Sequence, residues 1–217
     1  MLLLRQLGPY LAEMVGAFAL VFAGCGAIVI DHVAHGQLTH VGIAISFGLV
    51  IAVMIYATGH ISGAHLNPAV TLAFAFTRHF PFARVPLYWI AQTLGASLAA
   101  LLLRVLFGNV AHLGATIPTG SDGQSFGLEI VLTFFLMFVI MAVATDNRAV
   151  GEAAAIAIGG TVLLDAMVGG PISGASMNPA RSLAPAVVSG NLQFIWIYLT
   201  APFIGASAAI CVYNLMK

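Results

Sequence analysis

Long apolar segments alternate with short polar breaks along the whole chain. A helix needs about 20 mostly apolar residues to cross the hydrocarbon core of a bilayer. Polar and turn-forming residues divide this chain at 32–40, 58–68, 78–86, 108–125, 146–152 and 169–179. The pattern therefore predicts six membrane-spanning helices, at about 8–30, 41–58, 86–107, 126–145, 152–168 and 194–216.

Two further apolar pieces, 67–77 and 178–188, are too short to cross a bilayer. Each begins with Asn-Pro-Ala, formed by Asn67, Pro68 and Ala69 in the first piece and by Asn178, Pro179 and Ala180 in the second. Proline suits the first turn of a helix because its missing N–H has no partner there. Both pieces are therefore predicted to be half-helices that enter the membrane without crossing it.

The composition leaves no room for a soluble domain. Of the 217 residues, 61% are hydrophobic and 6% are charged, whereas an ordinary soluble domain has about a quarter charged residues. Six spans use roughly 120 positions, so a nucleotide-hydrolysing subunit or a separate catalytic domain is excluded. Seven basic and seven acidic residues cancel, and nothing in this balance indicates nucleic acid as a partner.

The chain contains an internal repeat. Residues 60–73 (HISGAHLNPAVTLA) and 171–184 (PISGASMNPARSLA) lie 111 positions apart and agree at nine of fourteen positions. Residues 91–100 and 201–210 share five further identities, and Glu13 pairs with Glu129 at a similar offset. We interpret residues 1–217 as a single transmembrane domain of two units, about 1–108 and 120–217. With three spans in each unit, the second unit enters the membrane inverted.

The inversion brings the two half-helices together near the middle of the membrane. Irregular backbone at that depth is tolerated where it lines a water-filled cavity. Asn67 and Asn178 would then present amide donors where two positive helix ends converge, which orients a passing molecule and disfavours cations. The alternative is that each Asn only caps its helix. The repetition of the motif in inverted units favours the pathway.

Positive charge predicts the orientation. With the N-terminus in the cytoplasm, Arg5, Arg78, Arg84, Arg148 and Lys217 all face the cytoplasm, while Arg104 faces outward. We therefore expect a multi-pass protein of the cell (inner) membrane with both termini cytoplasmic.

With its paired HISGAHLNPAVT and GASMNPARS motifs, the whole chain resembles the aquaporins of the major intrinsic protein family. The resemblance implies an all-α membrane fold of six transmembrane helices and two re-entrant half-helices. It also implies a homotetramer in the lipid bilayer, with one pore in each subunit that passively conducts water or small uncharged solutes and excludes protons and ions. It implies no cofactor, no metal and no enzymatic activity.

The resemblance also implies an aromatic/arginine selectivity filter outside the Asn pair. Its Arg follows the second motif and is Arg181, and counting from the motifs places the other positions at Phe47, Ala166 and Ala175. Water-selective relatives have His where this chain has Ala166, so we expect the filter to pass solutes wider than water. Bracing of loop backbone is an alternative role for Arg181 that is compatible with lining the pore.

The segment GPISGASMNPARSLAP is most similar to the nodulin-26-like branch, whose members pass water, glycerol, ammonia or neutral metalloid acids. Glycerol facilitators usually have Asp and Lys where this chain has Ser182 and Ala186, which counts against a dedicated glycerol facilitator. The nodulin-26-like branch usually has Trp at the position of Phe47.

Several polar residues in the spans have more than one interpretation. By resemblance, Glu13 and Glu129 support the loop backbone, although a proton relay is conceivable. His60 is expected to line the pore or brace its loop rather than bind metal. Asp165 either pairs with a polar group or faces the pore vestibule. The histidines of the first external loop are expected to be solvated rather than to sense pH or bind metal; they are His32, His35 and His40.

Two other classes of protein compete with a channel. A proton- or ion-coupled transporter needs ionisable groups along its path, and this path offers one Arg without a clear carboxylate pair. An intramembrane enzyme needs a nucleophile beside a base, and no such pair stands out. Flux that neither saturates nor responds to a proton gradient distinguishes a channel from a coupled transporter.

Overall fold

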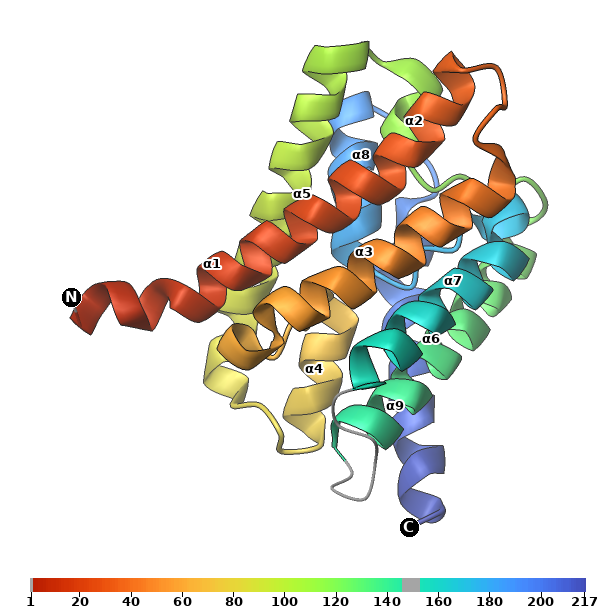
Figure 1. Cartoon of the computed structure of the whole chain (residues 1–217). Helices are drawn as coiled ribbons and strands as arrows, with labels where there is room; N and C mark the ends of the chain where they lie inside the picture. The colour runs from red at the N-terminus through yellow and green to blue at the C-terminus, as the bar shows by residue number, and fades with distance from the viewer. Residues whose placement is uncertain (1, 146–152) are drawn as a thin grey trace.

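The computed structural model describes residues 2–145 and 153–217. Every regular element in these two stretches is a helix, and Figure 1 shows the long helices packed into one tilted bundle around two short ones. Within these stretches, six helices are long and apolar enough to span a membrane: Leu7–Val33, Thr39–Ser62, Phe82–Phe107, Asp122–Ala144, Ala154–Ser173 and Ile195–Leu215. The predicted fold class is confirmed.

The first span consists of three helical pieces in line. Helix α1 (Leu2–Leu20) continues through a π-helical turn, η1 (Val21–Cys25), into α2 (Gly26–Val33). Single π-helical turns inside α-helices occur frequently at functional sites. Gly24 lies in this turn, and a Cβ atom there would collide with the ring of Phe47. The turn therefore brings the backbone of the first span directly against the second.

The remaining elements follow the predicted order. The second and third spans are α3 (Thr39–Ser62) and α5 (Val85–Phe107), with the half-helix α4 (Pro68–Phe76) and the short η2 (Phe82–Arg84) between them. After η3 (Val110–Gly114), the second unit contains α6 (Asp122–Ala144), α7 (Ala154–Ser173), the half-helix α8 (Pro179–Ser189) and α9 (Ile195–Leu215).

Two spans end later than the polar breaks predict. Helix α3 continues to Ser62 and α7 to Ser173, where the expected ends were 58 and 168. Each stops at a glycine with positive φ, Gly63 at +87° and Gly174 at +83°. A left-handed residue after the last turn is a common way to end a helix, and glycine adopts it without a Cβ clash. The break at 146–152 and the orientation expected for Arg148 lie outside the described residues.

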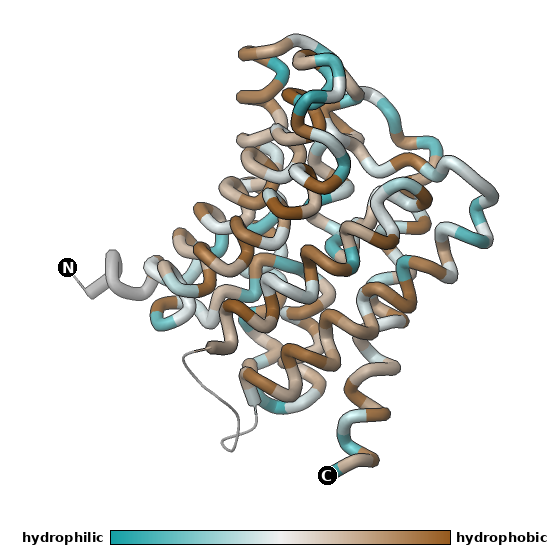
Figure 2. Tube along the Cα trace, turned by 45° about the vertical axis from the view of Figure 1, so that its right-hand side comes forward, coloured by the Kyte–Doolittle hydropathy of each residue, from teal (hydrophilic) through white to brown (hydrophobic). Residues whose placement is uncertain are grey.

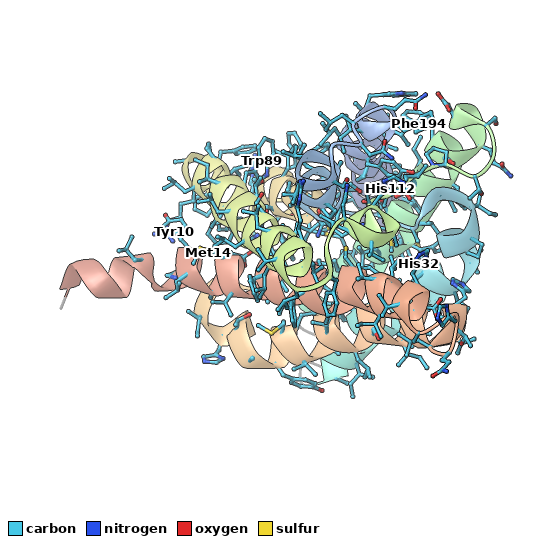
Figure 3. All side chains as sticks on the ribbon, turned by 90° about the horizontal axis from the view of Figure 1, so that it is seen from above. Tyr10, Met14, His32, Trp89, His112 and Phe194 are labelled. Carbon is cyan, nitrogen blue, oxygen red and sulfur yellow. The ribbon has the colours of Figure 1, made fainter. Side chains whose placement is uncertain are left out.

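Equivalent glycines hold the helices of the two units together. A Cβ atom on Gly95 of α5 would collide with the Met14 carbonyl of α1, and one on Gly205 of α9 would collide with the Ile130 carbonyl of α6. Figure 3, in which Met14 is labelled, shows α1 lying alongside α5. Small residues allow this close approach of membrane helices. Many large apolar side chains are exposed on the outside of the bundle. Figure 2 shows that apolar residues, in brown, occur along all the long helices.

Candidate functional site

The two Asn-Pro-Ala segments form the N-termini of the two half-helices. The Asn67 side-chain oxygen accepts a hydrogen bond from the Ala69 N–H of α4 at 2.9 Å. The Asn178 side-chain oxygen accepts from the N–H groups of Ala180 and Arg181 of α8 at 3.0 and 3.2 Å. Both asparagines are therefore N-caps, and in each helix a proline follows at the first helical position.

The amide nitrogens of the same asparagines reach across to the opposite segment. Asn67 Nδ2 donates to the Met177 carbonyl at 2.7 Å, and Asn178 Nδ2 donates to the Leu66 carbonyl at 2.8 Å. This reciprocal pair ties the two half-helices together through residues that are about 110 positions apart. An amide nitrogen carries two N–H groups, so each asparagine retains a second donor for a molecule beside it.

One cavity of about 110 Å³ runs past this junction. Its wall includes both asparagines and all four positions of the expected filter: Phe47, Ala166, Ala175 and Arg181. Much of the remaining wall is apolar, with Ile51 and Ile55 from α3 and Ile158 and Val162 from α7. The structure thus brings side chains from α3, α7 and both half-helix segments to a single narrow space.

Arg181 is the charged residue in the wall of this cavity, and it is only 2% exposed. Its Nη1 donates to the Gly114 carbonyl at the end of η3, at 2.9 Å. Its Cζ lies 4.9 Å from the centroid of the Phe47 ring, which is within the range of a cation–π contact. Its Nε is buried and has no hydrogen-bond partner among the described residues. The guanidinium is thus held on two sides, and N–H groups besides the one bound to Gly114 remain as donors.

Glu13 and Glu129 lie behind the junction, in equivalent places of the two units. Glu13 accepts hydrogen bonds from the N–H groups of His65 and Leu66 at 2.9 and 2.7 Å, and from the Ser62 hydroxyl at 2.7 Å. Glu129 accepts the same set in the second unit, from Ser173 at 2.7 Å and from the Ser176 and Met177 N–H groups at 2.8 Å. Each carboxylate thus holds the irregular backbone that precedes a half-helix.

Two tyrosines complete these networks, and the sequence alone predicted no role at the site for either of them. Tyr88 donates to the Ser62 carbonyl at 2.8 Å, and Tyr198 donates to the Ser173 carbonyl at 2.6 Å. Both side chains are almost fully buried. The spacing of 110 residues between them, which matches the repeat, was the available signal.

The first unit has a polar group that the second lacks. Gln92 Nε2 donates to Glu13 at 2.8 Å and to the Thr71 hydroxyl at 2.9 Å. Pro202 is the counterpart of Gln92 at the offset of 110. In addition, Trp89, labelled in Figure 3, donates from its indole to the Pro68 carbonyl at 3.0 Å. Two side chains of α5, those of Trp89 and Gln92, therefore hold the first turn of α4, while Tyr88 holds the end of α3.

The two histidines that flank the first motif, His60 and His65, lie in different surroundings. His60 is exposed on the last turns of α3 and is not part of the cavity wall. His65 lines the cavity instead, with its Nδ1 3.2 Å from the Thr71 hydroxyl. The reason is that α3 extends to Ser62, so the irregular backbone that faces the cavity begins only after that residue.

The other polar residues are placed as follows. Asp165 is 7% exposed, its Oδ2 has no hydrogen-bond partner among the described residues, and it is not part of the cavity wall. His32 and His35 are exposed. In the described part of the chain, no group of three His, Cys, Asp or Glu side chains is arranged to hold a metal ion.

Comparisons with known proteins find relatives along nearly the whole chain. Residues 3–213 match the major intrinsic protein family. Nodulin-26 from Glycine max is 56% identical over 207 residues, which are 95% of this chain and 76% of that protein. Aquaporin NIP1-1 from Oryza sativa subsp. japonica is 55% identical over 208 residues, covering 95% of this chain and 73% of the relative.

A solved structure supports the fold independently. The aquaglyceroporin from Plasmodium falciparum superposes with a TM-score of 0.87 over 97% of this chain and 95% of that one. Its sequence identity of 24% is low, so this likeness speaks for the fold alone.

Proposed function

Because the chain belongs to the major intrinsic protein family and is a membrane channel for water and small neutral solutes, we propose that its pathway is the cavity between the two Asn-Pro-Ala segments. Proteins of this family are transporters, so the chain is not an enzyme. The reciprocal hydrogen bonds of Asn67 and Asn178 across the junction carry this proposal most directly.

Cations and protons are excluded at the junction and again at Arg181. The N-termini of the two half-helices meet at the junction, and each contributes a positive partial charge of about half an elementary charge. A water molecule at the junction accepts from the second N–H of each Asn, so its own protons point outward along the cavity and a proton cannot pass through it easily. The buried guanidinium adds a full positive charge to the wall.

The selectivity filter consists of Phe47, Ala166, Ala175 and Arg181, and it admits solutes wider than water. The two alanines supply only methyl groups to the wall, so the ring of Phe47 and the guanidinium are its two large members. The guanidinium of Arg181 has N–H donors besides the one bound to Gly114, and these can donate to a hydroxyl oxygen of a passing polyol or neutral acid. We assign glycerol, ammonia and neutral metalloid acids as candidate solutes besides water.

Swelling measurements test the solute range. Stopped-flow light scattering of proteoliposomes with glycerol, urea and boric acid gives one permeability for each solute, and sucrose gradients give the water permeability. We expect glycerol or boric acid to enter faster than into empty liposomes, with flux proportional to concentration and unaffected by a proton gradient. Saturating flux driven by a proton gradient would support the coupled transporter instead.

Assembly and membrane orientation are part of the same proposal. Resemblance to the family supports a homotetramer with one pathway in each subunit, which analytical ultracentrifugation in detergent can test. The loop between α4 and α5, whose sequence contains Arg78 and Arg84, lies at the end of the bundle where the C-terminus lies (Figure 1), and this supports a cytoplasmic location for both termini in the cell membrane. The two repeat units, about 1–108 and 120–217, form one channel domain.

A further inference from the structure

His40 connects the second span to the fifth near the outer end of the bundle. It lies on the first turn of α3, half-buried, and its Nε2 is 2.8 Å from the Met167 carbonyl oxygen of α7. A carbonyl oxygen only accepts hydrogen bonds, so Nε2 carries the proton in this contact. Figure 1 shows α3 and α7 side by side along this part of the bundle.

The Met167 carbonyl needs an external donor because of Pro171. Inside an α-helix, a carbonyl accepts from the N–H four residues later, and proline has no N–H. Pro171 is inside α7, four positions after Met167. In the first unit, His60 occupies the position of Pro171 at the repeat offset of 111 and retains its N–H. The unpaired carbonyl is thus a feature of α7 and not of α3.

Gly170 makes room for the imidazole ring. A Cβ atom on Gly170 would lie 2.7 Å from Cε1 of His40, which is closer than real Cβ contacts. A side chain at this position would push the ring away from α7. Gly170 and Pro171 together therefore provide both the space for the ring and the acceptor it binds.

The contact lies next to the proposed filter. Met167 directly follows Ala166, and His40 precedes Phe47 by seven residues on α3. The same two helices also touch at a second point, because a Cβ atom on Gly48 would lie 2.6 Å from the Gly159 carbonyl oxygen.

Phe47 on α3 and Ala166 on α7 therefore each lie between two contacts that join these helices. On α3 these points are residues 40 and 48, and on α7 they are residues 159 and 167, so eight residues separate them on each helix. That distance is about 12 Å along a helix axis. Any movement of α7 relative to α3 at the outer point would shift Ala166 relative to the ring of Phe47.

We propose that His40 is a positioning residue for the selectivity filter: its imidazole binds the Met167 carbonyl left unpaired by Pro171 and thereby sets the distance between Ala166 and Phe47. This inference rests on the proposed filter. Loss of the bond lets the last turns of α7 shift toward another donor. This shift changes the width of the filter, which affects the permeability of a solute that nearly fills the filter more than it affects the permeability of water.

The test compares the ratio of glycerol to water permeability in proteoliposomes for His40→Ala, Pro171→Ala and the double variant. His40→Ala is expected to change this ratio at least about threefold, because pore width decides which solutes pass. Pro171→Ala restores an N–H that binds Met167 within the helix, so adding His40→Ala to it is expected to change nothing further. His40→Gln retains a donor and should keep the ratio of the parent, as should the control His35→Ala on the exposed loop.

Three results would overturn the inference. They are an unchanged ratio in correctly inserted His40→Ala, an equally large effect of His40→Ala in the Pro171→Ala background, and failure of the double variant to fold. Ala166→His, measured in parallel, separates the inference from its premise. If Ala166→His leaves the ratio unchanged, the proposed filter is wrong; if it changes the ratio and His40→Ala does not, only the role of His40 is wrong.

Discussion

The guanidinium carbon of Arg181 lies 4.9 Å from the centroid of the Phe47 ring, so the charged and the aromatic side of the cavity wall touch each other. Arg181 comes from the start of the half-helix α8 and Phe47 from the second span α3. Ala166 and Ala175 line the same cavity. If these four residues form the proposed filter, the two alanines are its small members.

Removal of the Arg181 guanidinium should weaken the exclusion of ions without lowering water permeability. Arg181→Val makes the second motif equivalent to the first, which has Val70 at this position. We expect water permeability to stay similar or rise, while protons or small cations become measurably permeant, because the wall loses its full charge. A pH-sensitive dye and osmotic swelling on the same vesicles measure both.

Arg181→Lys is the matched control for charge. Lysine keeps the positive charge but lacks the planar fork that holds Arg181 between Gly114 and Phe47, so we expect partial exclusion. If the Val variant conducts water and stays as tight to protons and cations as the parent, Arg181 only braces the backbone of η3.

Replacement of either junction asparagine by aspartate should admit cations. In Asn67→Asp, a carboxylate cancels part of the positive field of the helix ends and also loses the bond to the Met177 carbonyl. Loss of that buried bond costs about 1–3 kcal/mol of folding free energy. Cation conductance in planar bilayers is the measurement, with Asn178→Asp as the equivalent change in the other unit. Unchanged conductance in both folded variants would contradict the role of the junction.

A larger side chain at position 166 should restore discrimination in favour of water. Ala166→His adds an imidazole to the wide side of the filter, so glycerol or boric acid flux is expected to fall more than water flux. Ala166→Leu narrows the same side without adding a donor, which separates the effect of width from that of polarity. Equal losses of water and solute flux in both variants would mean that residue 166 does not limit the solute.

Glu129 should matter for stability more than Asp165 does, although both are buried carboxylates of the membrane spans. Glu129 accepts hydrogen bonds from Ser173, Ser176 and Met177, whereas Asp165 Oδ2 has no hydrogen-bond partner among the described residues. In Glu129→Gln an amide nitrogen faces these donors, which should cost about 1–3 kcal/mol for the unsatisfied group. Thermal unfolding in detergent measures the loss of stability in Glu129→Gln and in Asp165→Asn. A larger loss in Asp165→Asn would contradict this ranking.

The sequence by itself determined the spans and the half-helices, and it pointed to six residues of the cavity wall: Phe47, Asn67, Ala166, Ala175, Asn178 and Arg181. These features depend on local requirements: a bilayer needs long apolar segments, and a half-helix start needs a cap followed by proline. The repeat between residues 60–73 and 171–184 then related the two halves. The resemblance to the aquaporins pointed to Arg181 and Phe47, by counting from the two motifs.

Only the tertiary structure decided which polar groups meet. Nothing local distinguishes His60 from His65, and the difference arises because Gly63 ends α3 after the first of them. The bond of Asn67 to Met177 and that of His40 to Met167 join residues more than 100 positions apart, so their partners depend on how the two units pack. A buried donor or acceptor must find a partner wherever packing brings one, and the sequence around it does not specify which one that is.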